Sequence, residues 1–120
     1  LSHCWGEPEN MAKTLLSNLE AYKSEIAWEK LTKTFQHAVH FTYRFGIRYL
    51  WIDSLCIVRD DIDDWRAESA KMARVFESAF LTIMATGSRD GSAGLYADCP
   101  QAPNFQSLYH TSPIREIRTD

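Results

Sequence analysis

The stretch that decides the predicted fold is IRYLWID, residues 47–53. Aromatic and β-branched side chains dominate it, and residues 49–52 are apolar on both faces. A strand that is covered on both faces belongs in the middle of a parallel sheet, so we expect a buried strand here. A second apolar run, FLTIMAT at residues 80–86, stops at Gly87 and is expected to be another strand.

One helix is expected before residues 47–53 in the sequence, and another is expected after them. Residues 32–45 carry apolar side chains at three-and-four spacing, and Gly46 supplies the left-handed residue that ends a helix cheaply. A second helical pattern covers residues 64–78, where Asp63 or Asp64 is the natural N-cap. These two patterns predict amphipathic helices that pack on the sheet.

The order of the elements indicates the fold class. A weaker apolar repeat predicts an earlier helix over residues 12–22, and the chain begins inside what looks like the end of a strand. Strand end, helix, helix, strand, helix, strand is typical of an α/β domain with a parallel sheet, whose first strand is here expected to be truncated. We expect one domain over residues 1–97 and a connector rich in loops over residues 98–120, where proline punctuates the sequence.

The composition of the chain excludes several classes of function. The chain has 120 residues, 13 Lys and Arg against 16 Asp and Glu, a net charge of −3, and 45% hydrophobic residues, which describes one globular domain. Without a basic cluster, no nucleic acid or anionic membrane is expected as a partner. No apolar run approaches the roughly 18 residues of a membrane-spanning helix. Three cysteines that form no disulfide framework favour reduced thiols, so we expect a cytoplasmic protein.

The cysteines allow the less favoured hypothesis of a catalytic thiol. Cys4, Cys56 and Cys99 form no CxxC pair, so reduced thiols are expected and a zinc site is not. Cys56 with His3 could form a thiol nucleophile and its base, since both lie at the ends of expected strands. The alternative is that Cys56 is a small core residue.

Ligands of open parallel sheets bind beyond the carboxyl ends of the strands. Ser2, His3, Trp5 and Gly6 follow the expected first strand, and Asp53 ends the second. The sequence therefore predicts that these residues line one crevice. Structural alternatives stay open, because a tryptophan at a strand end often packs and an aspartate there often caps a turn.

Glu68 is the candidate catalytic residue on the second helix. Helical spacing places its carboxylate about 60° from Trp65, at the edge of the apolar face. Such a carboxylate beside a crevice is a candidate for a raised pKa and for acid–base or cation-stabilising work. The alternative is that an acid in the first helical turn complements the helix dipole, and spacing does not separate the two.

No metal site is expected. The four aspartates within residues 60–64 do not fit a calcium-binding loop, because Trp65 stands at its glycine position and Lys71 at its closing glutamate. His37 and His40 lie three residues apart, but the sequence offers no third ligand.

Four stretches, taken in order, resemble the fungal heterokaryon incompatibility (HET) domain. They are LSHCWG at residues 1–6, LTKTFQHAVHFTYRFGIRYLWIDSLCIVRDDIDDW at residues 31–65, ES..M..VF..A at residues 68–79 and GLY at residues 94–96. The most specific part is WIDSLCI followed by an acidic loop and a tryptophan. Arg59 and Phe76 depart from the family pattern, which usually has glutamine and tyrosine there.

The resemblance implies a role in non-self recognition, in which incompatible allele products meet in a fused cell and trigger programmed cell death. HET domains are thought similar to Toll/interleukin receptor (TIR) domains, which implies a flavodoxin-like three-layer fold with a short parallel sheet. Some TIR domains cleave NAD with a glutamate that follows a tryptophan by four residues on a helix. Here Trp65 and Glu68 are three residues apart, and both spacings return to the same side of a helix.

An NAD glycohydrolase hypothesis follows from this resemblance. Glu68 would bind the ribose hydroxyls and stabilise the positive charge that develops as nicotinamide leaves. Trp5 would stack on a ring of the dinucleotide, while Ser2, His3 and Asp53 would line the pocket. NAD would be the substrate, with no metal or further cofactor.

Two other functions stay open. The first is a non-catalytic death-signalling module that associates with itself, with allelic products or with other incompatibility proteins, and whose Trp5, Trp51 and Trp65 belong to the core. The second is a cysteine hydrolase that uses Cys56.

Overall fold

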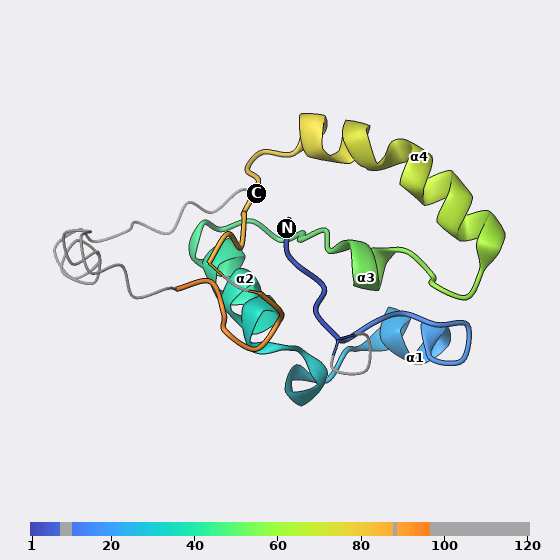
Figure 1. Ribbon diagram of the computed structural model, residues 1–120, viewed down its shortest axis with the longest axis horizontal. Coiled ribbons are helices and arrows are strands. Elements are labelled where there is room, and N and C mark those ends of the chain that lie inside the picture. Colours follow the sequence, from blue (N-terminus) through green and yellow to red (C-terminus); the bar gives the residue numbers. More distant parts are fainter. Residues whose placement is uncertain (8–10, 88, 97–120) are drawn as a thin grey trace, which may run out of the picture.

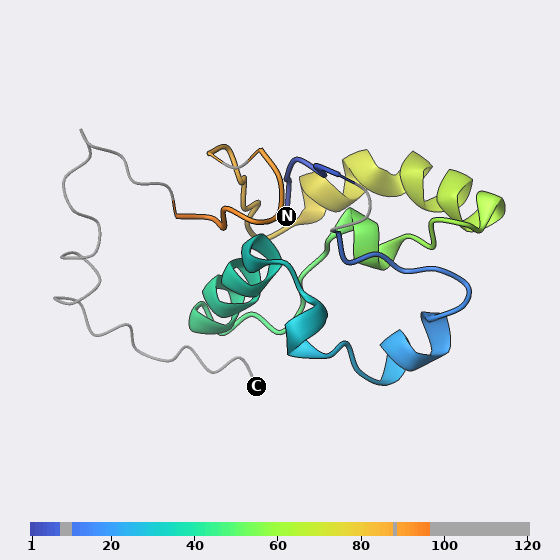
Figure 2. The ribbon, with the colours of Figure 1, turned by 60° about the horizontal axis from the view of Figure 1, so that its bottom comes forward.

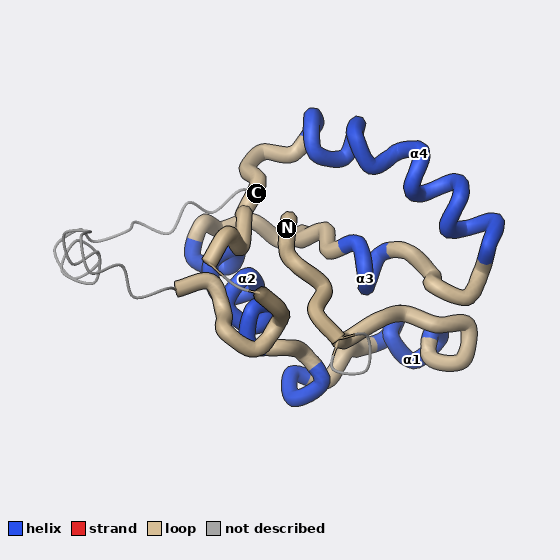
Figure 3. Tube along the Cα trace, in the orientation of Figure 1, coloured by secondary structure: helices blue, strands red, loops and turns tan. Residues whose placement is uncertain are grey.

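The computed structural model describes residues 1–7, 11–87 and 89–96, and its regular elements are helices (Figure 1). They are α1 (Leu19–Ser24), the short 3₁₀ helix η2 (Trp28–Lys30), α2 (Lys33–Arg44), α3 (Asp53–Cys56) and α4 (Ile62–Ser78). Long loops join them, and no strand occurs in these ranges (Figure 3). The expected α/β fold, a TIR/flavodoxin-like three-layer domain with a short parallel sheet and a truncated first strand, is therefore wrong for the residues described.

Residues 80–86, expected to be a strand, form a loop that pairs with the N-terminal segment at one point. Ser2 and Met84 make an isolated parallel bridge. In this bridge the N–H of Ser2 donates to the carbonyl of Ile83 at 2.8 Å, and the N–H of Ala85 donates to the carbonyl of Ser2 at 2.9 Å. A strand requires consecutive pairs along a ladder, and here the pairing is a single bridge.

Residues 47–53 are also a loop rather than a strand. The nitrogen of Leu1 donates to the carbonyl of Trp51 at 2.8 Å, and this hydrogen bond is their main-chain link to the N-terminal segment. Ile52 is 3% exposed, but Tyr49 is 85% exposed, so the expected covering of both faces does not occur. Burial of Ile52 in the core fixes this loop without a sheet.

Helix α2 confirms the prediction over residues 32–45 to within one residue at each end. Thr32 is the N-cap, and its hydroxyl accepts a hydrogen bond from the N–H of Phe35 at 3.4 Å. Gly46 follows the C-cap with φ +68°, the left-handed conformation that favours glycine. Phe35 and Ala38 are fully buried, as the apolar stripe predicts.

Helix α4 confirms the predicted second helix, but it begins earlier and has another cap. Asp61 is the N-cap, because its carboxylate accepts hydrogen bonds from the N–H groups of Asp63 and Asp64, both at 3.1 Å. The prediction of Asp63 or Asp64 as the cap is wrong. No residue of α4 is buried, so its apolar side is only partly covered.

The core gathers side chains from four separate segments of the chain and none from α4. Its buried members are Leu1, Met11, Ala12, Phe35, Ala38 and Ile52. Helix α4 lies at the edge of the molecule in both views (Figures 1 and 2). The helix expected over residues 12–22 forms only in part, as α1.

Two further findings concern the chain as a whole. None of the helices in the described ranges is long and apolar enough to cross a membrane. Residues 98–120, expected to be a connector, lie outside the described residues, as does Cys99, and the division at residue 97 stays a prediction.

Candidate functional site

Residues that the sequence places in one crevice meet around Asp53. The indole Nε1 of Trp5 donates to Asp53 Oδ2 at 2.9 Å, and the N–H of Ser54 donates to Oδ1 at 2.8 Å. His3 Nδ1 lies 3.8 Å from Oδ1. The structure therefore brings His3, Trp5 and Asp53 together, although the parallel sheet behind this prediction is absent from the described residues.

The start of α3 holds the Asp53 carboxylate in place. Asp53 is the first residue of this helix, and its side chain accepts from the N–H of the next residue, as aspartate often does at a turn. The Asp53 side chain is 18% exposed. Its hydrogen bonds are therefore partly shielded from water, which strengthens them.

His3 is the most buried side chain of this group, with an exposed fraction of 3%. Its ring meets the Phe35 ring edge-on, with 4.9 Å between the centroids. Neither ring nitrogen has a hydrogen-bond partner among the described residues. Burial lowers the pKa of His3, the Asp53 carboxylate opposes this shift, and the nearby terminal amino group adds to it. His3 is therefore neutral at neutral pH.

Arg59 is the member of the site that sequence reasoning missed. Its guanidinium carbon lies 4.0 Å from the centroid of the Trp5 ring, a cation–π contact. Trp5 also packs against the core cluster. Arg59 thus occupies ring surface that a stacked ligand would need. The signal that could have found it is the departure from the family pattern at position 59.

Glu68 and Trp65 both lie on α4. Glu68 accepts a hydrogen bond from Lys71 Nζ at 2.9 Å, and its side chain is 29% exposed. Trp65 is 45% exposed. Within the described residues, no hydrogen bond or ion pair joins either of them to Asp53. Both the Asp53 and the Glu68 carboxylates raise the pKa of Cys56, and whether Glu68 shares a pocket with Asp53 stays a prediction.

Ser2 and Gly6 have main-chain roles. Ser2 makes the bridge to Met84 through its N–H and carbonyl groups. Gly6 has φ +64°, and a Cβ built on it would collide with the side chain of Asp90. Both residues shape the N-terminal segment that carries His3 and Trp5.

The environment of Cys56 does not favour a thiolate. Cys56 is exposed, yet the partial burial of its thiol raises the thiol pKa. A hydrogen bond from the Ile52 main chain and the terminal amino group oppose this shift, and the carboxylates of Asp53 and Glu68 add to it. A thiol with a raised pKa is a weak nucleophile at neutral pH. No group of three or more potential metal ligands occurs in the part of the chain that the structure describes.

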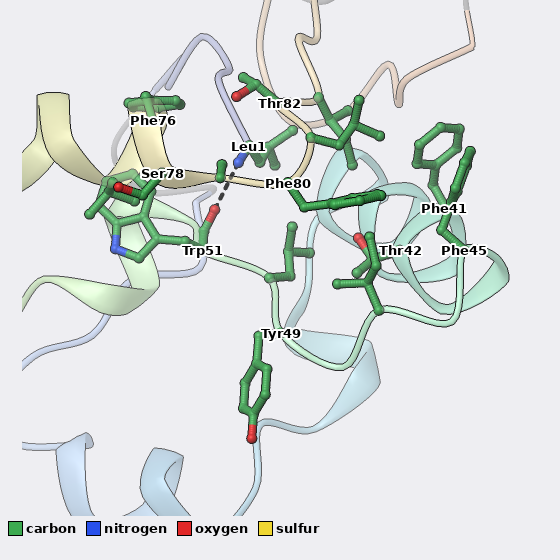
Figure 4. Close-up of a pocket in the computed structure, with 16 residues that line it drawn as sticks. Leu1, Phe41, Thr42, Phe45, Tyr49, Trp51, Phe76, Ser78, Phe80 and Thr82 are labelled. Carbon is green, nitrogen blue, oxygen red and sulfur yellow. Dashed lines mark hydrogen bonds between the residues drawn. The ribbon is translucent and has the colours of Figure 1, made fainter. Parts of the chain in front are cut away.

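A second feature is an open apolar groove of about 240 Å³, lined by side chains of the two loops that hold Trp51 and Phe80 and by parts of α2 and α4 (Figure 4). Figure 4 shows Trp51 and Phe76 on one side of Leu1, and Phe41 and Phe45 on the other. The Trp51 and Phe76 rings meet edge-on at 5.6 Å. The groove is lined by Leu1, Phe41, Thr42, Phe45, Ile47, Tyr49, Leu50, Trp51, Val75, Phe76, Ser78, Ala79, Phe80, Leu81, Thr82 and Ile83.

Several large side chains of this groove are open to solvent. Phe80 is 85% exposed, Leu81 48% and Phe45 47%. No lysine, arginine, aspartate or glutamate lines the groove. Sequence reasoning missed this feature, because it assigned the two loops to the interior of a sheet.

Fold and site together define a small, mostly helical domain with a closed polar cluster and an open apolar groove. The family model of the heterokaryon incompatibility protein (HET) matches residues 1–116. The chain therefore belongs to the HET family, as the resemblance in the sequence predicts, and this membership implies a role in heterokaryon incompatibility and cell death. Comparisons with curated proteins and with solved structures found no match.

Proposed function

We propose that the chain acts in heterokaryon incompatibility as a non-catalytic interaction module that engages partner proteins when non-self is met. The observation that carries this proposal is the groove with its exposed Phe45, Phe80 and Leu81. Exposed apolar patches are typical of surfaces that bind other proteins. The partners are allelic products or other incompatibility proteins, including further copies of this chain.

The polar cluster supports the same choice. Trp5 already bonds to Asp53 and carries Arg59 on its ring, while His3 is buried and neutral. The contacts among Trp5, Asp53 and Arg59 satisfy one another within the protein, as a structural cluster needs, whereas a catalytic site needs groups that are free to meet a substrate. His3 is the exception, because neither of its ring nitrogens has a hydrogen-bond partner among the described residues.

NAD cleavage by Glu68 is the second candidate function, and one observation favours it. The Glu68 carboxylate contributes to raising the pKa of Cys56, the last residue of α3. Against it, Glu68 is paired with Lys71, and Arg59 covers part of the Trp5 ring.

Substitutions in the full-length protein separate the two functions. Phe80→Asp places a charge in the groove at a side chain that is 85% exposed, so the fold tolerates it, and Tyr43→Asp is the matched control at 76% exposure outside the groove. We expect Phe80→Asp to abolish cell death when expressed in fungal cells, while Tyr43→Asp and Glu68→Gln kill as the parent does.

Cellular NAD, measured in the same cultures before death, completes the test. No NAD loss is expected for the parent at the time when death begins. If Glu68→Gln prevents both NAD loss and death while Phe80→Asp kills normally, the interaction module is rejected in favour of the enzyme.

A further inference from the structure

Residues 91–96, drawn in orange in Figure 1, lie against α2 and are hydrogen-bonded to it near both of their ends. The carbonyl of Gly91 accepts from the N–H of Thr34, at the start of the helix, at 3.0 Å. About one turn further along the helix, His37 Nδ1 accepts from the N–H of Leu95 at 3.1 Å. The first hydrogen bond joins two main-chain groups, whereas the second depends on the protonation state of a side chain.

The main chain at this second contact fits closely against the His37 ring. Gly94 has φ +83°, and a Cβ built on it would collide with that ring. The Tyr96 ring also packs against His37, with 4.8 Å between the ring centroids. Leu95 lies between these two residues in the sequence and packs against the hydrophobic core cluster. Release of this part of the chain would therefore uncover part of the core.

The hydrogen bond from Leu95 requires that His37 Nδ1 carries no proton. A neutral imidazole has one acceptor nitrogen, and a protonated imidazole has none. Protonation of His37 therefore replaces the acceptor by an N–H group that faces the N–H of Leu95. Two donors cannot form a hydrogen bond with each other, so the charged ring no longer holds this part of the chain.

We propose that His37 is a pH-sensitive latch, whose neutral ring holds residues 94–96 against α2 and whose protonation at Nδ1 releases them. These three residues are the latched segment. The hydrogen bond between Thr34 and Gly91 does not titrate, so it stays in place when the latched segment leaves. No residue of the latched segment lines the apolar groove, and the latch therefore goes beyond the proposed function and does not rest on it.

The surroundings of His37 favour release as the pH falls. Burial lowers its pKa most, and Lys33 and His40 on the same helix lower it further. Tyr96 is the titratable group that faces the ring from the latched segment. Asp90 precedes this segment, and its carboxylate accepts from the main-chain N–H two residues further along at 2.7 Å. The attached state therefore binds a proton less readily than the released state, and release is favoured below the ordinary histidine pKa of 6.5.

Hydrogen exchange of the full-length protein, resolved to single amides, tests the latch. The Leu95 amide should be protected at about pH 7.5, and its protection relative to an unfolded chain at the same pH should fall at least about fivefold by about pH 5. The Thr34 amide, which bonds to Gly91, should keep its protection over the same range. Unchanged protection at Leu95 would overturn the proposal, and so would an equal loss at Thr34, because the start of the helix would then open as a whole.

Two histidine variants separate His37 from other titrating groups. His37→Asn supplies a side-chain carbonyl that does not titrate in this range, so the protection of Leu95 should be the same at both pH values. His40→Asn is the matched control, because His40 is exposed on the same helix and packs against Trp28, and it should retain the loss seen in the parent. A pH-dependent Leu95 amide in His37→Asn, or a pH-independent one in His40→Asn, would assign the release to another group and overturn the proposal.

Discussion

The carboxylate of Asp53 links the start of α3 to the N-terminal segment that carries Trp5. One oxygen accepts from the start of α3, and the other accepts from Trp5, which lies 48 positions earlier in the sequence. A hydrogen bond to a charged group contributes more to stability than one between neutral groups. Single substitutions at this cluster should therefore have effects that exceed those at the surface.

Trp5→Phe should lower the free energy of unfolding by about 2 kcal/mol. The change removes the indole donor to Asp53, worth about 1.5–3 kcal/mol for a charged acceptor, and weakens the Arg59 cation–π contact. Urea unfolding at equilibrium measures the loss. Trp65→Phe is the control, since Trp65 is 45% exposed, and it should change stability by less than about 0.5 kcal/mol. Equal losses in the two variants would contradict this account.

Stability should fall as the pH drops below the ordinary pKa of histidine. Burial lowers the pKa of His3 in the folded state from the ordinary value of 6.5, so below that value the unfolded chain binds more protons than the folded one. The contribution is complete above pH 6.5 and is lost as the pH falls toward the lower folded pKa. His37 also makes the folded state less stable as the pH falls, because burial, Lys33 and His40 lower its pKa in the folded state.

Urea unfolding between about pH 7.5 and about pH 5.5 measures this dependence. His3→Gln and His37→Gln should each show a smaller decrease than the parent over this range. A decrease that stays the same in both variants would assign the pH dependence to other groups.

At the level of elements, the two long helices differ in what stabilises them. Helix α2 buries Phe35 and Ala38 completely, and the hydrophobic effect therefore holds it in place. Helix α4 has no buried residue and relies on its N-terminal cap, on the hydrogen bond from Val58 N–H to Asp64 and on the Trp51–Phe76 contact. The N-cap should consequently matter more for α4.

Asp61→Ala should destabilise the start of α4 by about 1 kcal/mol, because it removes the acceptor for two main-chain N–H groups. Hydrogen exchange at residues 62–66 should become faster, while α2 keeps its protection. Asp61→Asn retains an effective cap and should leave the exchange rates near those of the parent. If the asparagine variant is as labile as the alanine variant, charge rather than capping holds the helix.

Local signals explain which elements could be predicted. Thr32, the apolar stripe and Gly46 lie within one stretch of chain, so α2 was predicted almost to the residue. The apolar runs at residues 47–53 and 80–86 were predicted as strands from their composition, but a strand exists only through a partner that is distant in sequence. In the described residues this pairing is limited to the single bridge between Ser2 and Met84. The composition of the two apolar runs does not indicate how far such pairing extends.

At the level of the whole molecule, the fold depends on a junction of three distant segments. Leu1 and Ser2 connect to Trp51 on one side and to Ile83 and Ala85 on the other. The same junction positions His3 and Trp5 beside Asp53. These three residues were predicted to meet, for a reason that proved wrong, whereas Arg59 belongs to the cluster through a contact that no spacing in the sequence indicates.

Ala85→Pro should open this junction. The substitution removes the N–H that donates to the carbonyl of Ser2 at 2.9 Å, in a residue that is 6% exposed. We expect a loss of about 1–3 kcal/mol in unfolding free energy and faster hydrogen exchange at the Ser2 amide. Thr86→Pro is the control, since Thr86 is exposed and its N–H makes no hydrogen bond among the described residues. Unchanged exchange at Ser2 in the Ala85 variant would contradict the role of the junction.

The partly covered helix α4 has a consequence for how this protein can change over generations. Its outward positions contribute little to the buried core, so substitutions there leave the free energy of unfolding nearly unchanged. Alleles can therefore diverge along this helix while the fold persists.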